Sequence, residues 1–252
     1  MKPVLEVQNL TKIFSYKGQP DITAVSDISF QIFPGEWVAL IGESGSGKST
    51  IAKMVTRLLA PSKGSILLNG RDITHMKGMQ LKPIYQKIQM VFQTPAGSFD
   101  PRRTLGDGIG ESLRNSGMSR MQTEERVIQL LTQCGLDGSF AKYYPHEASG
   151  GQCQRAAIAR ALAIEPELLI CDEITSALDV TVQAQIMELL HSIQKRTNMA
   201  YLFISHDLAL VQQFSHRILV LQQGKLIEEG TPDEIIFHPK EAYTKQFIES
   251  TL

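Results

Sequence analysis

The sequence predicts an α/β protein with a mixed, mainly parallel core sheet, and three observations support that prediction. Beyond residue 147, apolar strand-like runs alternate with helical patterns. These runs are almost continuously apolar, which is typical of strands covered on both faces of a parallel sheet. A glycine-rich segment at 42–50 also joins an apolar run directly to a helical pattern, as strand–loop–helix units do.

The composition is that of an ordinary globular protein, and it limits the partners of the chain. The 252 residues have a net charge of −1 and no basic run, so nucleic acid is not an expected partner. No segment reaches the run of about 18 apolar residues that a membrane span needs. The three cysteines lack the spacing of metal ligands, and we expect three buried thiols.

The N-terminal part of the chain predicts mainly strands. Runs at 4–14, 22–32 and 37–42 are rich in β-branched residues and are separated by turn-forming Gly and Pro. The pattern changes to a helix at 49–59, and 65–73 returns to strand.

The rest of the chain divides into a helical stretch and an alternating stretch. Residues 96–150 have helical fragments with little strand signal, which predicts a helical insertion. The elements predicted after it are helix 151–163, strand 167–173, helix 182–196, strand 200–205, a further helix, hairpin 217–230, and a tail from Thr231 with a short helix and a polar end. We expect one domain over 1–252, with a core at 1–95 and 151–235 and a C-terminal tail at 236–252.

The segment GESGSGKST at 42–50 matches the phosphate-binding loop pattern. Its glycines let backbone N–H groups surround phosphates, Lys48 can reach the terminal phosphates, and the Ser49 hydroxyl can bind Mg²⁺. A strand before the motif and a helix after it are the context that it requires. The predicted nucleotide-binding residues are Gly42, Ser44, Gly45, Ser46, Gly47, Lys48, Ser49 and Thr50.

Two carboxylates end the apolar run at 168–173. Asp172 lies where open α/β sheets bind their ligands, and it is placed to hold Mg²⁺ through a water molecule. Glu173 can act as a general base that polarises an attacking water molecule. The alternative is that the Asp-Glu pair simply ends the strand and caps the next helix.

Two further polar residues follow apolar runs and are expected at the same edge of the sheet. His206 can contact a terminal phosphate or orient water, and its alternative role is structural. Gln93 can coordinate Mg²⁺ or water, because its amide both donates and accepts. Together with the loop at 42–50, these residues predict hydrolysis of a Mg²⁺-bound nucleotide. A guanine-reading N-K-x-D motif is missing, which disfavours a GTPase.

A second glycine-rich helix start occurs in EASGGQCQRAAIARAL at 147–162. Free backbone N–H groups at such a start form an anion site, but this one has no lysine. A small-molecule kinase does not need a second anion site of this kind, so the segment at 147–162 disfavours that class of enzyme.

The motifs, in this order and over nearly the whole chain, resemble those of the ATP-binding cassette (ABC) ATPases. The resemblance identifies 42–50 as Walker A, Gln93 as the Q-loop glutamine, and 168–172 as Walker B before the catalytic Glu173. The other motifs are the signature Ala148-Ser149-Gly150-Gly151-Gln152, the D-loop Ser176-Ala177-Leu178-Asp179 and the switch histidine His206. The resemblance implies a P-loop NTPase fold of the ABC type, with a RecA-like core, an N-terminal antiparallel β subdomain and a helical signature subdomain. It also implies ATP and Mg²⁺ as cofactors, with Ser49, Gln93 and Asp172 at the metal.

The family stacks its adenine on an aromatic residue near the N-terminus. Phe14 matches that position, and Tyr16 is the alternative. The interpretation without a binding role is that Phe14 is an ordinary aromatic residue of a strand. The family also pairs two cassettes head to tail, with each ATP between one Walker A motif and the partner's signature. This implies that four residues act on the partner's ATP: Ser149, Gly150, Gly151 and Gln152.

Two longer segments, at 92–114 and 176–190, resemble the peptide and nickel importers of the family. In that group the first segment belongs to the helical insertion that contacts the permease. Many peptide-import members have a longer C-terminus with clustered cysteines, and this chain has no such cluster. The resemblance therefore favours the shorter members, which include nickel and metal-chelate systems. Ala148 replaces the usual leucine, and we expect weaker packing there without loss of binding.

We expect a peripheral ATPase subunit on the cytoplasmic face of a bacterial membrane. Its expected partners are transmembrane permease subunits, a second ABC ATPase subunit and, indirectly, an extracytoplasmic binding protein. The ATPase pair is expected to be a heterodimer, with a homodimer as the alternative, and the cargo to be a di- or oligopeptide, nickel or a metal chelate. Two alternative functions are a non-transport ABC ATPase of nucleic-acid repair or translation, and an accessory ABC subunit of a soluble complex.

Overall fold

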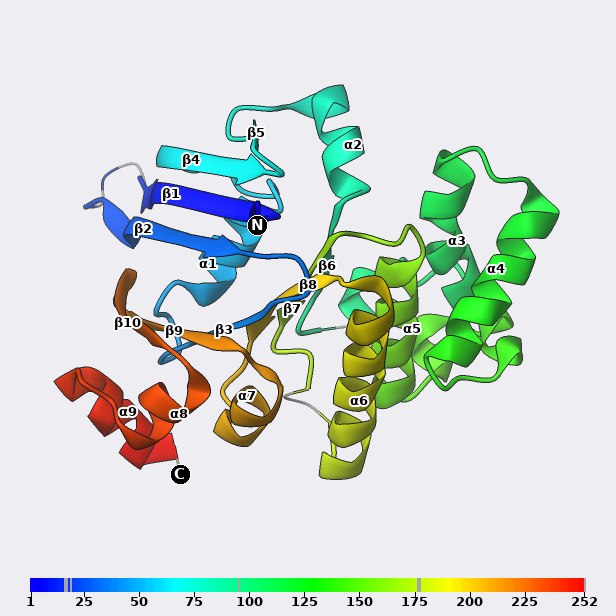
Figure 1. Cartoon of the computed structure of the whole chain (residues 1–252). Helices are drawn as coiled ribbons and strands as arrows, with labels where there is room; N and C mark the ends of the chain where they lie inside the picture. The colour runs from blue at the N-terminus through cyan, green and yellow to red at the C-terminus, as the bar shows by residue number, and fades with distance from the viewer. Residues whose placement is uncertain (16–17, 19, 95, 176–177, 252) are drawn as a thin grey trace.

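The computed structural model describes residues 1–15, 18, 20–94, 96–175 and 178–251. Within them the chain forms two sheets with helices packed around them (Figure 1). The six-stranded sheet has the order β10-β9-β3-β8-β7-β6, and the four-stranded sheet has the order β2-β1-β4-β5. The mixed, mainly parallel sheet beside an antiparallel N-terminal sheet confirms the predicted fold class.

The six-stranded sheet is parallel from β9 to β6, and β10 runs antiparallel to β9. Every residue of β3, β7 and β8 is buried, which explains why these strands do not alternate between polar and apolar residues. The strands are β3 Trp37–Ile41, β6 Ile88–Val91, β7 Leu168–Asp172, β8 Ala200–Ile204, β9 Arg217–Gln222 and β10 Lys225–Gly230.

The four-stranded sheet is antiparallel throughout. Its first strand buries Leu5, Val7 and Leu10, whereas Gln8 and Asn9 are exposed, so one face of the sheet covers the core. The strands are β1 Leu5–Phe14, β2 Ile22–Ile32, β4 Lys63–Leu68 and β5 Arg71–Asp72.

Alternate residues of β3 face two different hydrophobic cores. Val38 and Leu40 pack with the four-stranded sheet and with α1 (Lys48–Val55), so α1 lies between the two sheets. Trp37 and Ala39 pack in a second core with the helices on the opposite face of the six-stranded sheet. Because β3 is held from both sides, the loop that follows it has a rigid base.

The helices of the second core cover the far face of the six-stranded sheet and extend to one side of it (Figure 1). α3 contacts α4, and α5 contacts both, so the helical layer predicted at 96–150 continues into the helix that begins at Gly150. The helices that follow α1 in the sequence, as far as β9, are α2 Lys82–Tyr85, α3 Leu105–Asn115, α4 Arg120–Gln133, α5 Gly150–Leu162, α6 Val180–Thr197 and α7 Leu208–Phe214.

The end of the chain differs from the short helix and polar end that we expected. Two helices, α8 (Pro232–Phe237) and α9 (Ala242–Thr251), follow β10. α9 buries Phe247 and Ile248 in the second core. The signal that was overlooked is the i, i+4 spacing of Tyr243 and Phe247 among polar residues, which places both on one face of a helix.

The cysteines behave as expected from their spacing. Cys134, Cys153 and Cys171 are buried and unpaired. Burial raises the pKa of Cys134 to about 12, which keeps that thiol protonated and unreactive. In the part of the chain that the structure describes, no helix is long and apolar enough to cross a membrane.

Candidate nucleotide site

The loop between β3 and α1 contains the predicted phosphate-binding motif and follows a path that requires glycine. Gly47 has a φ of 107° and caps α1, and a Cβ atom there would lie 2.6 Å from the carbonyl oxygen of Ala24. A Cβ atom on Gly42 would lie 2.2 Å from the carbonyl oxygen of Leu221. The loop is therefore held tightly between β2 and β9, and a side chain at either position would displace it.

Lys48 is buried at the base of this loop, with 4% of its surface exposed. Its ammonium group donates to the carbonyl oxygens of Gly42 and Glu43, both at 2.7 Å. Burial lowers the Lys48 pKa, and the negative charges of Glu173 and Asp172 oppose that shift. The loop thus combines a buried cation with backbone N–H groups, which is the chemistry that binds phosphate.

Ser49 and Asp172 form an oxygen pair that fits Mg²⁺. Asp172 ends β7 and is 6% exposed, and Ser49 Oγ donates to its Oδ1 at 3.1 Å. Burial raises the Asp172 pKa, against the lowering effect of the Ser49 hydrogen bond. Two hard oxygen donors suit Mg²⁺, which takes its other ligands from water and phosphates. Among the described residues, no group of three or more His, Cys, Asp or Glu could hold a metal without such additional ligands.

Glu173 lies where three loops of the parallel sheet meet. Its φ of 50° is left-handed, which costs a residue with a side chain about 1–2 kcal/mol. Its backbone N–H donates to Ile204 of β8 at 3.0 Å. Gln93 Nε2 donates to one carboxylate oxygen at 2.5 Å, and His206 Nε2 lies 2.6 Å from the other. The structure therefore brings Gln93, Glu173 and His206 together at the carboxyl edge of the sheet, where ligands of such folds bind.

A cavity of about 280 Å³ lies between the loop and these three side chains. Gly42 and Ser46 belong to the loop but not to the lining, and Ser46 Oγ lies 3.4 Å from Lys48 Nζ. The lining residues are Ala24, Ser44, Gly45, Gly47, Lys48, Ser49, Thr50, Gln93, Glu173 and His206. Most of the predicted nucleotide-binding residues thus share one cavity with the predicted catalytic residues.

Phe14 does not line this cavity. It ends β1 and is half-buried, and Lys12 Nζ lies over its ring, 5.0 Å from the centroid. Lys12 also donates to the carbonyl oxygen of Ala60 at 2.9 Å, which fixes the cation over that face of the ring. Tyr16, the alternative aromatic, lies outside the described residues. Adenine stacking on Phe14 stays a prediction.

The four signature residues begin α5 and do not line the cavity. Ser149 Oγ accepts from the Gln152 N–H at 3.3 Å, and Gln152 Oε1 accepts from the Ser149 N–H at 2.8 Å. This capping box fixes the first turn of the helix. Ser149 and Gly150 are exposed, whereas Ala148 is half-buried against the second core.

The start of α6 lies beside the signature residues. A Cβ atom on Gly151 would lie 3.2 Å from Val182 Cγ1, in the first turn of α6. Asp179 caps that turn, because its Oδ1 accepts from the Val182 N–H at 3.0 Å. Ser176 and Ala177, two of the other three predicted D-loop positions, lie outside the described residues. Asp179 thus caps α6, and its assignment to a D-loop stays a prediction.

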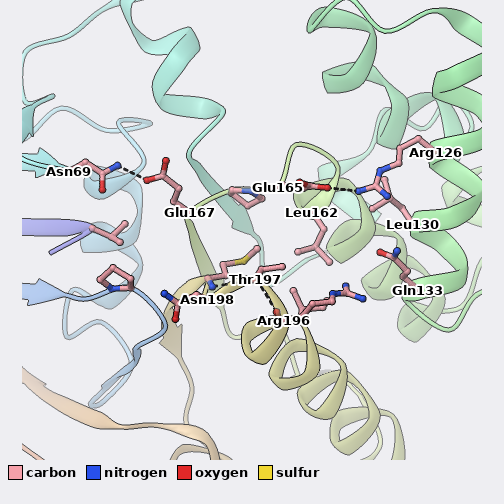
Figure 2. A pocket seen from close by; sticks show the side chains of 15 residues that line it. Asn69, Arg126, Leu130, Gln133, Leu162, Glu165, Glu167, Arg196, Thr197 and Asn198 are labelled. Atoms are coloured by element: carbon pink, nitrogen blue, oxygen red, sulfur yellow. Dashed lines mark hydrogen bonds and ion pairs between the residues drawn. The ribbon is translucent and has the colours of Figure 1, made fainter. Parts of the chain in front are cut away.

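A second cavity, of about 590 Å³, lies elsewhere on the molecule (Figure 2). Glu167, directly before β7, lines it, so this cavity is at the opposite end of that strand from Glu173. Arg126 donates to Glu165 at 2.8 Å and Asn69 to Glu167 at 2.5 Å, as Figure 2 shows. These polar groups are paired within the protein, and none of the predicted site residues lines the cavity.

Two residues of the nucleotide site were not predicted from the sequence. Ala24 of β2 lines the cavity, and the carbonyl oxygen of Glu43 holds Lys48. In Glu43 a backbone group makes the contact, and every residue type has that group. Glu43 stands at a position of the loop motif that any residue type can occupy, and Ala24 lies outside every motif, so the sequence singled out neither residue.

A phosphate-binding loop on a mainly parallel sheet, with Glu173 at the carboxyl edge, defines a P-loop nucleotide-binding domain. The family model described as ABC transporter matches residues 25–176, which is more than half of the chain. The chain therefore belongs to the ABC transporter family, as the resemblance of its motifs implies.

Two bacterial relatives are similar over almost all of this chain. The glutathione import ATP-binding protein GsiA of Pectobacterium atrosepticum is 41% identical over 254 residues, which cover 98% of this chain and 41% of that protein. The probable peptide ABC transporter ATP-binding protein y4tS of Sinorhizobium fredii is 42% identical over 252 residues, which cover 97% of this chain and 71% of that protein. The chain thus spans less than half the length of the first relative.

Solved structures support the same fold. The ATP-binding cassette MJ0796, solved as a dimer in a post-hydrolysis state with ADP and Pi, is 30% identical with a TM-score of 0.84, covering 90% of this chain and 98% of that one. The cbiO1 protein of Clostridium perfringens, part of the cbiONQ transporter complex, is 28% identical with a TM-score of 0.81, covering 94% and 92%.

Proposed function

We propose that the chain hydrolyses ATP in the cavity beside the loop at 42–50. The observation that carries this proposal is the Glu173 carboxylate, which Gln93 and His206 hold in the same cavity as Lys48. Glu173 accepts a proton from the attacking water, while Gln93 and His206 orient the carboxylate and the water. Lys48 and the N–H groups of the loop bind the phosphates.

Mg²⁺ is the proposed second cofactor, held by Ser49 and Asp172 with Gln93 beside them. The Ser49 hydroxyl and the Asp172 carboxylate, which lie 3.1 Å apart, would hold the ion through their oxygens, with a water molecule between Asp172 and the ion. When bound, the ion offsets the negative charge that develops on the phosphates. Asp172 supplies the carboxylate that keeps it next to the loop.

We propose that the start of α5 serves the ATP of a partner chain. Ser149 and Gly150 are exposed and do not line their own chain's cavity, and the MJ0796 cassette was solved as a dimer. A helix N-terminus stabilises an anion by about 0.3–1 kcal/mol, which lets the pair open again after hydrolysis. The partner is a second ABC ATPase chain, different from this one, with a second copy as the alternative.

We further propose that this ATPase powers an importer from the cytoplasmic face of a bacterial membrane. It docks on transmembrane permease subunits. An extracytoplasmic binding protein delivers the cargo to the permease and does not contact the ATPase. A di- or oligopeptide is the favoured cargo, because the two bacterial relatives are named for glutathione import and for peptide transport. Nickel and metal chelates are the alternatives.

Purification of the tagged chain from native membranes in mild detergent tests the docking. We expect permease subunits to co-purify, and we expect ATP turnover of the reconstituted complex to rise when cargo-loaded binding protein is added. Recovery without any membrane protein, or turnover stimulated by DNA or RNA, would favour a non-transport ABC ATPase instead.

A further inference from the structure

The C-terminal helix α9 contacts the phosphate-binding loop through one side chain, that of Tyr243. The backbone N–H of Glu43 donates to the Tyr243 hydroxyl oxygen at 3.3 Å, and the hydroxyl donates to the carbonyl oxygen of Leu221 at 3.4 Å. Both distances are slightly longer than the usual upper limits of about 3.2 Å for N–H···O and about 3.0 Å for O–H···O hydrogen bonds, so each contact is modest. Burial raises the Tyr243 pKa, which keeps the hydroxyl protonated and able to donate and accept at once.

The contact with Glu43 acts on the peptide unit that holds Lys48. The Glu43 N–H and the Gly42 carbonyl belong to one planar peptide, and in a trans peptide they point in opposite directions. The Gly42 carbonyl accepts from Lys48 Nζ at 2.7 Å, while the N–H on the other side is bound by Tyr243. A rotation of this peptide would break both contacts, so Tyr243 fixes the orientation of a carbonyl that positions Lys48.

The hydroxyl is presented by a helix that is itself firmly anchored. Glu228 of β10 accepts from the backbone N–H groups of Lys240 and Glu241 at 2.8 and 3.1 Å, directly before α9. Phe247 and Ile248 are buried in the second core, and α9 lies next to α8 (Figure 1). Tyr243 therefore acts from a rigid support rather than from a loose end of the chain.

We propose that Tyr243 is a positioning residue for the phosphate-binding loop, and this inference rests on the proposed ATPase function. Its hydroxyl holds the Gly42–Glu43 peptide in the orientation that aims Lys48 at the nucleotide phosphates. It does not line the cavity, so it takes no part in the chemical step. Without the hydroxyl, the loop samples other orientations before the nucleotide binds. The affinity for the nucleotide therefore decreases, whereas the turnover rate changes little.

The variant Tyr243→Phe removes the hydroxyl and keeps the ring in the core. We expect KM for ATP to rise about two- to tenfold, which is the effect of one modest hydrogen bond, with kcat changed less than about twofold. We also expect faster amide hydrogen exchange across residues 42–48 in the nucleotide-free protein. The matched control is Tyr143→Phe, which removes a hydroxyl from an exposed side chain and should change neither quantity.

Unchanged KM and unchanged exchange at 42–48 in Tyr243→Phe would overturn the inference. A lower melting temperature with unchanged exchange in this loop would also overturn it, because Tyr243 would then serve packing alone. A wild-type chain that binds Mg-ADP but does not hydrolyse ATP would instead refute the proposed function. In that case the exchange of residues 42–48 and the Mg-ADP affinity of Tyr243→Phe still decide the role of Tyr243.

Discussion

Glu173 combines a left-handed backbone with a carboxylate held between two polar side chains, and the proposed chemistry depends on it. The variant Glu173→Gln keeps the size of the side chain and removes the base. We expect kcat to fall about 100- to 10,000-fold while ATP still binds, because proton transfer is lost and the phosphate contacts are not. Single-turnover hydrolysis and equilibrium nucleotide binding measure the two quantities separately.

The control for this substitution is Glu188→Gln, at an exposed position on α6. It makes the same chemical change away from the cavity and should retain wild-type turnover. Hydrolysis by Glu173→Gln at the wild-type rate would remove Glu173 from the role of general base.

Asp172 shows a conflict between stability and function. Burial raises its pKa, so the folded chain binds the proton more tightly than the unfolded chain does. Stability therefore falls as the pH rises from the ordinary carboxylate pKa through the raised one, and it stays lower above that window. Asp172→Asn should raise Tm at pH 7 by a few degrees and weaken Mg²⁺-dependent nucleotide binding, as thermal melting and Mg²⁺ titration would measure.

Asp21→Asn changes an exposed carboxylate in the same way and should alter neither Tm nor Mg²⁺ dependence. A lower Tm for Asp172→Asn at pH 7 would mean that the charged carboxylate stabilises the fold through its contacts with Ser49 and Lys48. That result would contradict the stability cost assigned here to burial.

At the scale of elements, the first turn of α5 has two functions that substitutions can separate. Ser149 caps its own helix, and we propose that it faces the phosphate of a partner's ATP. Ser149→Ala loses the cap, at a cost of about 1 kcal/mol. Ser149→Asp keeps a good N-cap but brings a negative charge to the phosphate. We expect the Asp variant to retain its Tm and to lose ATP-dependent pairing, which light scattering measures.

These two variants also control for each other. If pairing depended only on a well-formed helix start, Ser149→Asp would pair normally and Ser149→Ala would pair weakly. Such a result would show that the start of α5 does not meet a phosphate.

The elements also show how far the sequence could predict the structure. The continuous apolar runs of β7 and β8 marked buried strands, and the loop motif marked its own residues, because each needs particular residue types at fixed spacing. α2 (Lys82–Tyr85) has four residues, too few to show a helical period. The contact between Tyr243 and Glu43 joins positions 200 residues apart, and no local pattern records such a contact.

For the whole molecule, the two elements that we propose to bind phosphate do not share one cavity. The loop at 42–50 lines the cavity with Glu173, whereas Ser149 and Gly150 are exposed outside its lining. The central claim is that one complete ATP site takes its loop from one chain and its signature from another. In a symmetric pair the same two surfaces meet twice, so the pair holds two such sites.

When the pair consists of two copies of this chain, mixing two inactive variants tests this claim most directly. Lys48→Ala disables the loop of a chain, and Ser149→Asp disables its signature. A mixed pair then contains one site with both defects and one site with neither. We predict that an equal mixture recovers about a quarter of wild-type ATP turnover, because about half of the pairs are mixed and each has one intact site. In a chain that pairs with itself, turnover no higher than that of the two variants measured alone would contradict the claim.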